Sequence, residues 1–462
     1  MKSIVTRFAP SPTGTLHMGG LRTALFNYVY SKQNNGKFLI RVEDTDRERS
    51  KKDFEKNILE NLLSIGLVPD DKPINQSERT EIYVEAAKKI IDSGNAYWCD
   101  CSAEELEEMR KEQSAAGKKP MYDGRSRNLG LSQSEKTVLR LATPESGEIV
   151  VNDLIRGEIK FSNKELDDLI LLRSDGSPTY HLCNVVDDYE QNVTTVIRGE
   201  DHISNTPRQI HIQNALGYPP LEYAHLPLVL GTDKKRLSKR NAATSLEEYK
   251  EKGYLDTAIL NTLARLGWSQ GDKEVFYLDD LIKEFKIEEV QKAGAIFDIT
   301  KLDWLNSQHL SNLTLEDFKN KLSPFLKNFN IDIKDHPNVD KLIDSMRTSD
   351  NTLSGISSNL KPYYKDIETY DEKAIKKFIN DKSLLVQLRT LLSEIDDWNQ
   401  EPIENALKDF QVTNDLSVPE VNQPIRISLV GSTKSPGLGL TLSIFDKNVA
   451  VKRIDDLINY IS

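Results

Sequence analysis

The sequence is poor in cysteine and lacks any long apolar run. Three cysteines in 462 residues argue against a disulfide framework and favour a reducing compartment. No apolar run approaches the roughly 18 residues that a membrane-spanning helix needs. The first residues, MKSIVTRFAPSP, lack both the apolar stretch and the small-residue cleavage site of a signal peptide. We therefore expect a cytoplasmic protein that does not associate with membranes.

The sequence also has fewer positive than negative residues, with 61 lysines and arginines against 72 aspartates and glutamates. The formal net charge is −11 and the isoelectric point is near 5.4, which is not typical of a nucleic-acid-binding protein, although local basic patches can still bind phosphates. The chain has no evident internal repeat or low-complexity linker. Its 38% hydrophobic and 29% charged residues are typical of globular proteins. The length predicts roughly two to four domains.

The stretch RFAPSPTGTLHMGGLRTALFNY, residues 7–28, combines prolines, glycines and one histidine ahead of an amphipathic run. β-Branched and aromatic residues at its start predict a strand, which Pro10 and Pro12 end. From Leu21 onward, apolar residues recur at i, i+3, i+4 and i+7, which predicts a helix. KFLIRV, residues 37–42, predicts a second strand. This order is typical of a βαβ unit in a parallel sheet.

Three glycines, Gly14, Gly19 and Gly20, lie where this helix is expected to begin. Free backbone N–H groups and the positive end of the helix dipole favour anions there, and His17 adds a donor. Glycines alone would also fit an ordinary tight turn. The phosphate-binding P-loop does not match, because Gly20 and Leu21 stand where it has Lys and Ser/Thr. The dinucleotide fingerprint of many oxidoreductases is absent here too.

A second cluster, KKRLSKR at residues 234–240, carries five positive charges in seven residues. By itself such a run indicates a solvated loop. Paired with a phosphate-binding helix start, it favours nucleotidyl transfer, because negative charge spreads over the phosphorus in the transition state and positioned lysines stabilise it.

Together these segments resemble the signatures of class I aminoacyl-tRNA synthetases. HMGG, preceded by PSPTGTL, resembles the HIGH signature, and RLSKR at residues 236–240 resembles the KMSKS signature. Five further segments resemble the glutamate–tRNA ligase branch in order and spacing. They are RFAPSPTG, RVEDTD, SPTYHLCNVVDD, IRGED and KLDWLN. The resemblance is specific over residues 1–310 and diffuse beyond them.

The resemblance implies an α/β Rossmann-like catalytic core with an inserted acceptor-binding domain, followed by an all-α anticodon-binding region. The expected parts are a catalytic domain at 1–78 and 180–230, an acceptor-stem domain at 79–179, a stem-contact domain with the basic loop at 231–315, and a helical region at 316–462. The residues alone indicate only that the last region is helical. One apolar face there is predicted to comprise Leu384, Leu388, Leu391, Leu392 and Ile395.

The resemblance also implies an activity and its partners. The enzyme would form glutamyl-adenylate from L-glutamate and ATP, releasing pyrophosphate, and then transfer the glutamyl group to the terminal adenosine of tRNA(Glu), releasing AMP. Mg²⁺ would accompany ATP, and no protein nucleophile is required. Similar enzymes generally need tRNA before they activate glutamate. Charging of tRNA(Gln) stays open, and a monomer is the default expectation.

Residue roles follow from the matched motifs. The glutamate pocket is expected to comprise Arg7, Ser11, Glu43, Tyr180 and Arg198. This composition is chemically sensible, because guanidinium groups bind carboxylates in forked geometry and a carboxylate can face the substrate ammonium.

The ATP-binding residues are expected to comprise His17, Gly19, Gly20, Arg236, Ser238 and Lys239. Of these, His17 and Lys239 are the expected catalytic residues. Thr45 and Arg47 are expected to contact the 3′ end of the tRNA.

The chain departs from the pattern of some similar enzymes at a zinc site. Cys99 and Cys101 stand where those enzymes have the first pair of zinc ligands, but Ser126 and Asn128 occupy the later positions, and residues 18–180 contain no histidine. Because zinc requires four nitrogen or sulfur ligands, we expect no structural zinc and no other resident metal.

Three alternatives remain at this point. A glutamine–tRNA ligase of the same class is the nearest. A truncated paralogue that glutamylates a modified tRNA base would lack the helical C-terminal third. A non-enzymatic RNA-binding protein on this fold would be expected to lose His17 or Lys239, and both are present.

Overall fold

The computed structural model describes residues 3–461 apart from residues 47, 238–244, 334–337 and 380. The chain divides into two compact units, which are described separately. The first unit comprises Met1–Leu246 and Leu260–Asp298, and the second comprises Glu247–Ile259 and Ile299–Ser462. None of the described helices combines the length and the apolar character that crossing a membrane requires.

The first unit opens with the predicted βαβ arrangement. Strand β1 (Val5–Phe8) leads through α1 (Met18–Gln33) to β2 (Lys37–Val42), and the two strands are parallel. This confirms the predicted crossover. A Cβ atom at Gly36 would lie 2.0 Å from the carbonyl oxygen of Ile4, so only glycine lets the chain enter β2 this close to the first strand.

The first unit also contains a four-stranded sheet, in which the strands follow the order β7-β6-β10-β9. Its strands are β6 (Glu148–Asp153), β7 (Gly157–Ser162), β9 (Thr195–Gly199) and β10 (Glu222–Leu226). Strand β10 pairs in parallel with both β9 and β6. The Thr194 N–H donates to the Val5 carbonyl at 2.9 Å, so β1 lies beside the start of β9. Because β9 and β10 are parallel, their carboxyl ends meet at one edge, and the last residues of β1 line the same cavity as the last residues of β9 and β10.

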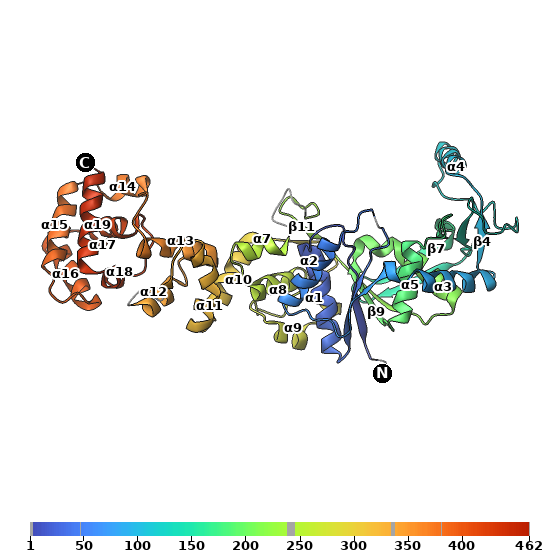
Figure 1. The fold of residues 1–462 in the computed structure, drawn as a ribbon, viewed down its shortest axis with the longest axis horizontal. Helices are drawn as coiled ribbons and strands as arrows, with labels where there is room; N and C mark the ends of the chain where they lie inside the picture. The colour runs from blue at the N-terminus through green and yellow to red at the C-terminus, as the bar shows by residue number, and fades with distance from the viewer. Residues whose placement is uncertain (1–2, 47, 238–244, 334–337, 380, 462) are drawn as a thin grey trace. The chain divides into compact units, whose positions relative to one another are not determined.

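Three further helices of this unit pack against one another. Helix α5 (Tyr180–Glu190) lies beside α3 (Thr80–Asp92) in Figure 1 and packs against it. It also packs against α6 (Thr206–Leu216). Their shared core also includes the antiparallel sheet β4 (Ala96–Cys99), β5 (Val138–Leu141) and β8 (Ile170–Leu172). The remaining elements of this unit are α2 (Lys52–Ser64), β3 (Ile74–Asn75), η1 (Gln76–Glu78), α4 (Ala103–Ala115), η2 (Asn163–Glu165), η3 (Glu200–Asn205), β11 (Val229–Leu230), α9 (Leu278–Glu284), η4 (Ile287–Glu289) and β12 (Ala295–Ile296).

The chain passes between the units at three points. The first two lie within the helices α7 (Leu246–Glu251) and α8 (Asp256–Arg265), and the third lies between Asp298 and Ile299.

The second unit is built of helices in the part that the structure describes (Figure 1). They are α10 (Ile299–Ser311), α11 (Leu315–Lys327), α12 (Val339–Met346), α13 (Leu353–Tyr364), α14 (Glu372–Phe378), α15 (Lys382–Glu394), α16 (Gln400–Thr413), α17 (Val418–Val430), α18 (Leu438–Ile444) and α19 (Lys447–Tyr460). Helix α19 packs against α15 and α17. The predicted all-α C-terminal region is confirmed.

The predicted apolar face of α15 is correct only in part. The helix buries Leu385, Leu388 and Leu392, whereas Leu384 and Leu391 are half-buried. The predicted residues and the buried residues both satisfy helical spacing. The packing partners of α15 decide which leucines lie at the centre of the buried face.

Candidate active site

A cavity of about 660 Å³ opens between the start of α1 and the carboxyl ends of β1 and β9. It is lined by all five residues of the predicted glutamate set, namely Arg7, Ser11, Glu43, Tyr180 and Arg198. It is also lined by four residues of the predicted ATP set, namely His17, Gly19, Gly20 and Arg236. The two other members of that set, Ser238 and Lys239, lie outside the described residues. Segments far apart in the sequence thus converge on one cavity.

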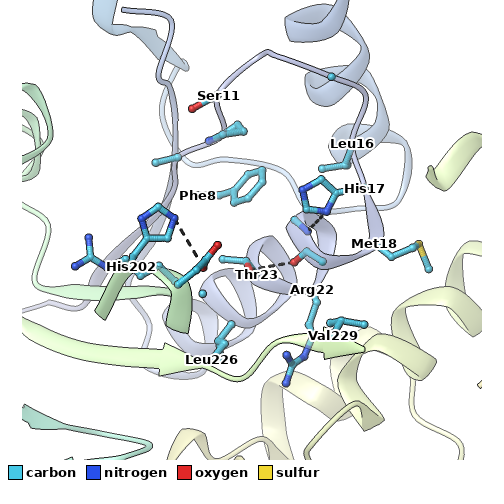
Figure 2. Close-up of a pocket in the computed structure, with 18 of the residues that line it drawn as sticks. Phe8, Ser11, Leu16, His17, Met18, Arg22, Thr23, His202, Leu226 and Val229 are labelled. Atoms are coloured by element: carbon cyan, nitrogen blue, oxygen red, sulfur yellow. Dashed lines mark hydrogen bonds and ion pairs between the residues drawn. The ribbon is translucent and has the colours of Figure 1, made fainter. Parts of the chain in front are cut away.

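At one end of the cavity, His17 caps helix α1. Its Nδ1 accepts a hydrogen bond from the Gly20 N–H at 3.0 Å. Burial lowers the pKa of His17, and nearby Arg236 acts in the same direction while Asp201 opposes it, so the ring is neutral near pH 7. Because Nδ1 accepts, the ring proton resides on Nε2, and His17 presents a donor (Figure 2).

The two glycines after His17 give its ring room. A Cβ atom at Gly19 would lie 3.3 Å from His17 Nδ1, and one at Gly20 would lie 3.5 Å from Cε1. The imidazole therefore lies against the bare backbone of the first helical turn, with Phe8 beside it and His202 across the cavity (Figure 2). The HMGG segment thus combines a helix cap, free N–H groups and an imidazole donor at one helix N-terminus.

At the other end of the cavity, Arg7 is buried and paired. Its Nε lies 2.9 Å from Asp188 Oδ1 and its Nη2 lies 3.3 Å from Asp188 Oδ2. The same carboxylate accepts from Arg41 Nη1 at 2.6 Å. Asn184 completes the cluster, because its Oδ1 accepts from both arginines at 3.4 and 3.2 Å.

Glu43 lies at the end of β2 and is nearly inaccessible. Its Oε1 accepts from Asn184 Nδ2 at 2.6 Å and lies 3.6 Å from Arg41 Nη2. Burial raises the pKa of Glu43 to about 7, although the guanidinium groups of Arg41 and Arg7 act in the opposite direction. A ligand cation placed beside this carboxyl would favour its ionised form.

Arg198 differs from Arg7 in its partners. Its side chain is 6% exposed, and its three hydrogen bonds go to neutral acceptors. Nε donates to His225 Nε2 at 3.2 Å, Nη1 to Gln209 Oε1 at 2.7 Å and Nη2 to Thr206 Oγ1 at 2.9 Å. Among the described residues, no carboxylate forms an ion pair with it. Since a guanidinium carries five N–H groups, two remain for a ligand.

Tyr180 lines the same end of the cavity. Burial raises its pKa to about 12, and the nearby Glu43 carboxyl acts in the same direction, so the phenol is neutral and can donate a hydrogen bond. This end therefore offers a charged guanidinium, a neutral phenol and a carboxyl group that ionises near neutral pH.

Arg236 of the basic segment and Thr45 of the predicted tRNA contacts lie nearer the surface. Arg236 is 65% exposed and its Nη2 lies 3.3 Å from Asp201 Oδ2 at the cavity rim. Thr45 is half-buried and is not among the residues that line the cavity as described. Arg47 lies outside the described residues. The predicted roles of Thr45 and Arg47 stay predictions.

Sequence reasoning missed Asn184 and Asp188, which hold Arg7, Arg41 and Glu43 together. The spacing was a signal, since Tyr180, Asn184 and Asp188 recur at intervals of four residues and therefore share a face of α5, but no helix was predicted there. It also missed His202, which lines the cavity.

The two cysteines of the inserted segment have local partners. The Cys99 thiol lies 3.3 Å from the Tyr122 hydroxyl, which in turn accepts from the Ser126 N–H at 3.0 Å. Cys101 Sγ lies 3.9 Å from the Ser102 carbonyl. In the described part of the chain, no three His, Cys, Asp or Glu side chains are grouped as metal ligands. The expected absence of structural zinc stays a prediction.

Comparison with known families gives two matches. Residues 3–304 match the family described as tRNA synthetases class I (E and Q), catalytic domain. Residues 317–458 match the family described as anticodon binding domain.

Individual proteins match along their whole length. A glutamate–tRNA ligase of Thermodesulfovibrio yellowstonii is 43% identical over 460 residues, covering 98% of this chain and 99% of that protein. Glutamate–tRNA ligase 2 of Halorhodospira halophila is 42% identical over 460 residues and covers 98% of each chain. A crystal structure of a glutamate tRNA ligase from Elizabethkingia meningosepticum, in complex with its amino acid, superposes with a TM-score of 0.89 at 33% identity over 100% of both chains.

Proposed function

The chain belongs to the glutamate–tRNA ligases, a family of class I aminoacyl-tRNA synthetases, and we propose that its cavity joins L-glutamate to the 3′ end of tRNA(Glu) in two ATP-dependent steps. The observation that carries this proposal is the buried guanidinium of Arg198, which has no carboxylate partner among the described residues and lies in the same cavity as Glu43. A buried charge without a partner is costly, so the site favours an anionic ligand.

Glutamate fits this end of the cavity in both sign and number of charges. Its ammonium can pair with Glu43, and its side-chain carboxylate can pair with Arg198. We assign the side-chain carboxylate to Arg198 because the α-carboxylate must stay available as a nucleophile. Arg7 is already paired with Asp188, so it adds positive potential and contributes less to selection between glutamate and glutamine.

ATP fits the His17 end. The α-carboxylate oxygen attacks the α-phosphorus, the bond to the pyrophosphate oxygen breaks, and pyrophosphate leaves. The His17 Nε2–H and the N–H groups at the start of α1 lie where charge develops, and Lys239 would add its charge from the basic segment. Mg²⁺ would enter bound to the phosphates of ATP, as part of that substrate.

The second step needs no protein nucleophile. A ribose hydroxyl of the terminal adenosine attacks the acyl carbon of glutamyl-adenylate, and AMP leaves. We assign Thr45 and Arg47 to the tRNA 3′ end. The domain boundaries proposed from the sequence assign acceptor-stem binding to residues 79–179, a further stem contact with the basic loop to 231–315 and anticodon binding to 316–462.

Charging of purified tRNA tests the proposal. The enzyme is incubated with ATP, Mg²⁺ and either tRNA(Glu) or tRNA(Gln), and each tRNA is offered radiolabelled glutamate or glutamine. We expect glutamyl-tRNA(Glu). Glutaminylation of tRNA(Gln) without use of glutamate would instead identify a glutamine–tRNA ligase and refute the proposal. The tRNA(Gln) plus glutamate arm measures how far the anticodon region restricts tRNA choice.

A further inference from the structure

Arg198 is held by a histidine that is itself held by a buried carboxylate. His225, on β10, is 0% exposed, and its Nδ1 lies 2.6 Å from Asp153 Oδ2 at the end of β6. Asp153 is fixed in turn, because its Oδ1 accepts from the N–H groups of Ile155 and Arg156 at 3.0 and 2.9 Å. A chain of contacts therefore runs from β6 through β10 to the guanidinium in the cavity.

The direction of each hydrogen bond in this chain follows from Asp153. Burial opposes ionisation of Asp153, but the hydrogen bonds from His225 and the backbone outweigh it and hold the pKa of this carboxyl below its usual value. An ionised carboxylate only accepts, so His225 carries its proton on Nδ1. Burial lowers the pKa of His225, so the ring is neutral and its Nε2 is an acceptor.

The polar groups around His225 Nε2 fit a ring that carries its proton on Nδ1 and accepts at Nε2. Arg198 Nε donates to it at 3.2 Å, and the Thr206 hydroxyl lies 3.2 Å away and can donate as well. The oxygen of that hydroxyl accepts from Arg198 Nη2 at 2.9 Å. If the proton were on Nε2 instead, two donors, the His225 Nε2–H and the Arg198 Nε–H, would face each other and this hydrogen bond would be lost.

Building on the proposed function, we propose that Asp153 and His225 are positioning residues for substrate selection: they orient Arg198 through the imidazole tautomer without neutralising its charge. The contrast with Arg7 gives the reason. A carboxylate placed directly against a guanidinium, as Asp188 is against Arg7, supplies the counter-charge that a substrate would otherwise supply. A neutral imidazole between Asp153 and Arg198 provides an acceptor while the positive charge stays available for the ligand.

Asp153→Asn tests this assignment with a change of few atoms. The remaining oxygen can keep the bonds from Ile155 and Arg156, whereas the amide NH₂ takes the place of Oδ2 and donates to His225 Nδ1. The backbone N–H of His225 loses its 3.1 Å acceptor, Oδ2, and keeps the 3.3 Å contact with Oδ1. The ring proton then moves to Nε2 and opposes Arg198. We expect the KM for glutamate in tRNA-dependent ATP–pyrophosphate exchange to rise by roughly 10–100-fold, with a reduced preference for glutamate over glutamine. The KM for ATP should change little.

Two further measurements separate positioning from a general structural role. Tyr223→Phe, on the same strand, removes only a hydroxyl that lies 3.3 Å from Gln213, so it should leave the KM for glutamate unchanged. Nitrogen-15 spectra of the histidines should show the His225 proton on Nδ1 in the wild type and on Nε2 in Asp153→Asn. If the Asn variant does not fold, Thr206→Val tests the same network and should raise the KM for glutamate in the same direction.

The outcomes distinguish the two proposals. An Asp153→Asn enzyme with an altered tautomer but an unchanged KM and unchanged selectivity would overturn the positioning role, as would an unchanged KM in Thr206→Val. Failure of the wild-type enzyme to activate glutamate would overturn the proposed function itself.

Discussion

The two ends of the cavity are built in different ways. The end assigned to ATP is largely local, since His17, Gly19 and Gly20 occupy one loop and one helical turn and act through backbone N–H groups and a capping imidazole. The end assigned to glutamate is assembled from distant segments, because Arg7, Glu43 and Arg198 lie on three different strands or strand ends and depend on side chains of α5, α6 and β10.

This difference fits the ligands that we propose for the two ends. Phosphates can be bound by many N–H groups of almost any fold, so a short glycine-rich helix start suffices. Distinguishing a carboxylate from a carboxamide requires a charge in a low-dielectric setting, and that charge must be supported on all sides by other buried groups. The glutamate end should therefore lose selectivity when one residue changes, whereas the ATP end should lose rate.

The largest effect is expected from Arg198→Gln. A site built around an unpaired guanidinium can reject the wrong isostere by on the order of 10⁴-fold, and this variant should lose most of that preference for glutamate over glutamine. Arg7→Gln is the matched control and should reduce selectivity less, because Asp188 keeps its bond from Arg41. Competition between the two amino acids in a charging assay measures both. If both variants lost the same amount of preference for glutamate over glutamine, the carboxylate pairing of Arg7 would not explain a difference between the two arginines.

The next effect concerns rate at the ATP end. Lys239→Ala should slow tRNA-dependent ATP–pyrophosphate exchange by about 10²–10³-fold, because a preorganised charge at the departing pyrophosphate stabilises the transition state. Arg236→Ala, three residues earlier, removes an expected ATP contact that is 65% exposed and already paired with Asp201, so it should slow exchange less than Lys239→Ala does. If Lys239→Ala exchanged pyrophosphate at the normal rate but bound tRNA weakly, the basic segment at residues 234–240 would serve to hold RNA and not to stabilise the transition state.

The ATP end was largely predictable from the sequence and the glutamate end only in part. The βαβ unit and its HMGG segment depend on local spacing, so strand, loop and helix could be predicted from residues 5–42. Arg7, Glu43 and Arg198 were assigned only by resemblance. Their partners could not be predicted, because contacts such as Asp153 with His225 span 72 positions and depend on how β6 pairs with β10. Local propensity carries no information about such pairings.

A smaller effect on rate, with stability nearly preserved, is expected from His17→Asn. Asparagine is a good N-cap, so it can replace the Nδ1 acceptor and change stability by only about 0.5 kcal/mol. It removes the Nε2–H donor, however, so exchange should slow by about 10²-fold. His17→Ala removes both functions and should lose a further ~1 kcal/mol of stability. If His17→Asn is fully active, the imidazole serves only as a helix cap.

The smallest effect is on the stability of the ligand-free enzyme and concerns Glu43. Because the pKa of this carboxyl is raised from 4.5 to about 7, its contribution to stability is fully present below pH 4.5 and is lost as the pH rises through 7. Glu43→Gln cannot ionise, so its thermal midpoint should match that of the wild type below pH 4.5 and exceed it at pH 8, by an amount corresponding to about 1–3 kcal/mol. Glutamate should raise the midpoint of the wild type at pH 8 and have little effect on the variant, because only the carboxylate can pair with the substrate ammonium.

Parallel pH profiles for the two proteins would mean that Glu43 is ionised throughout this range. The glutamate end would then hold its negative charge in advance, instead of acquiring it when the substrate ammonium arrives.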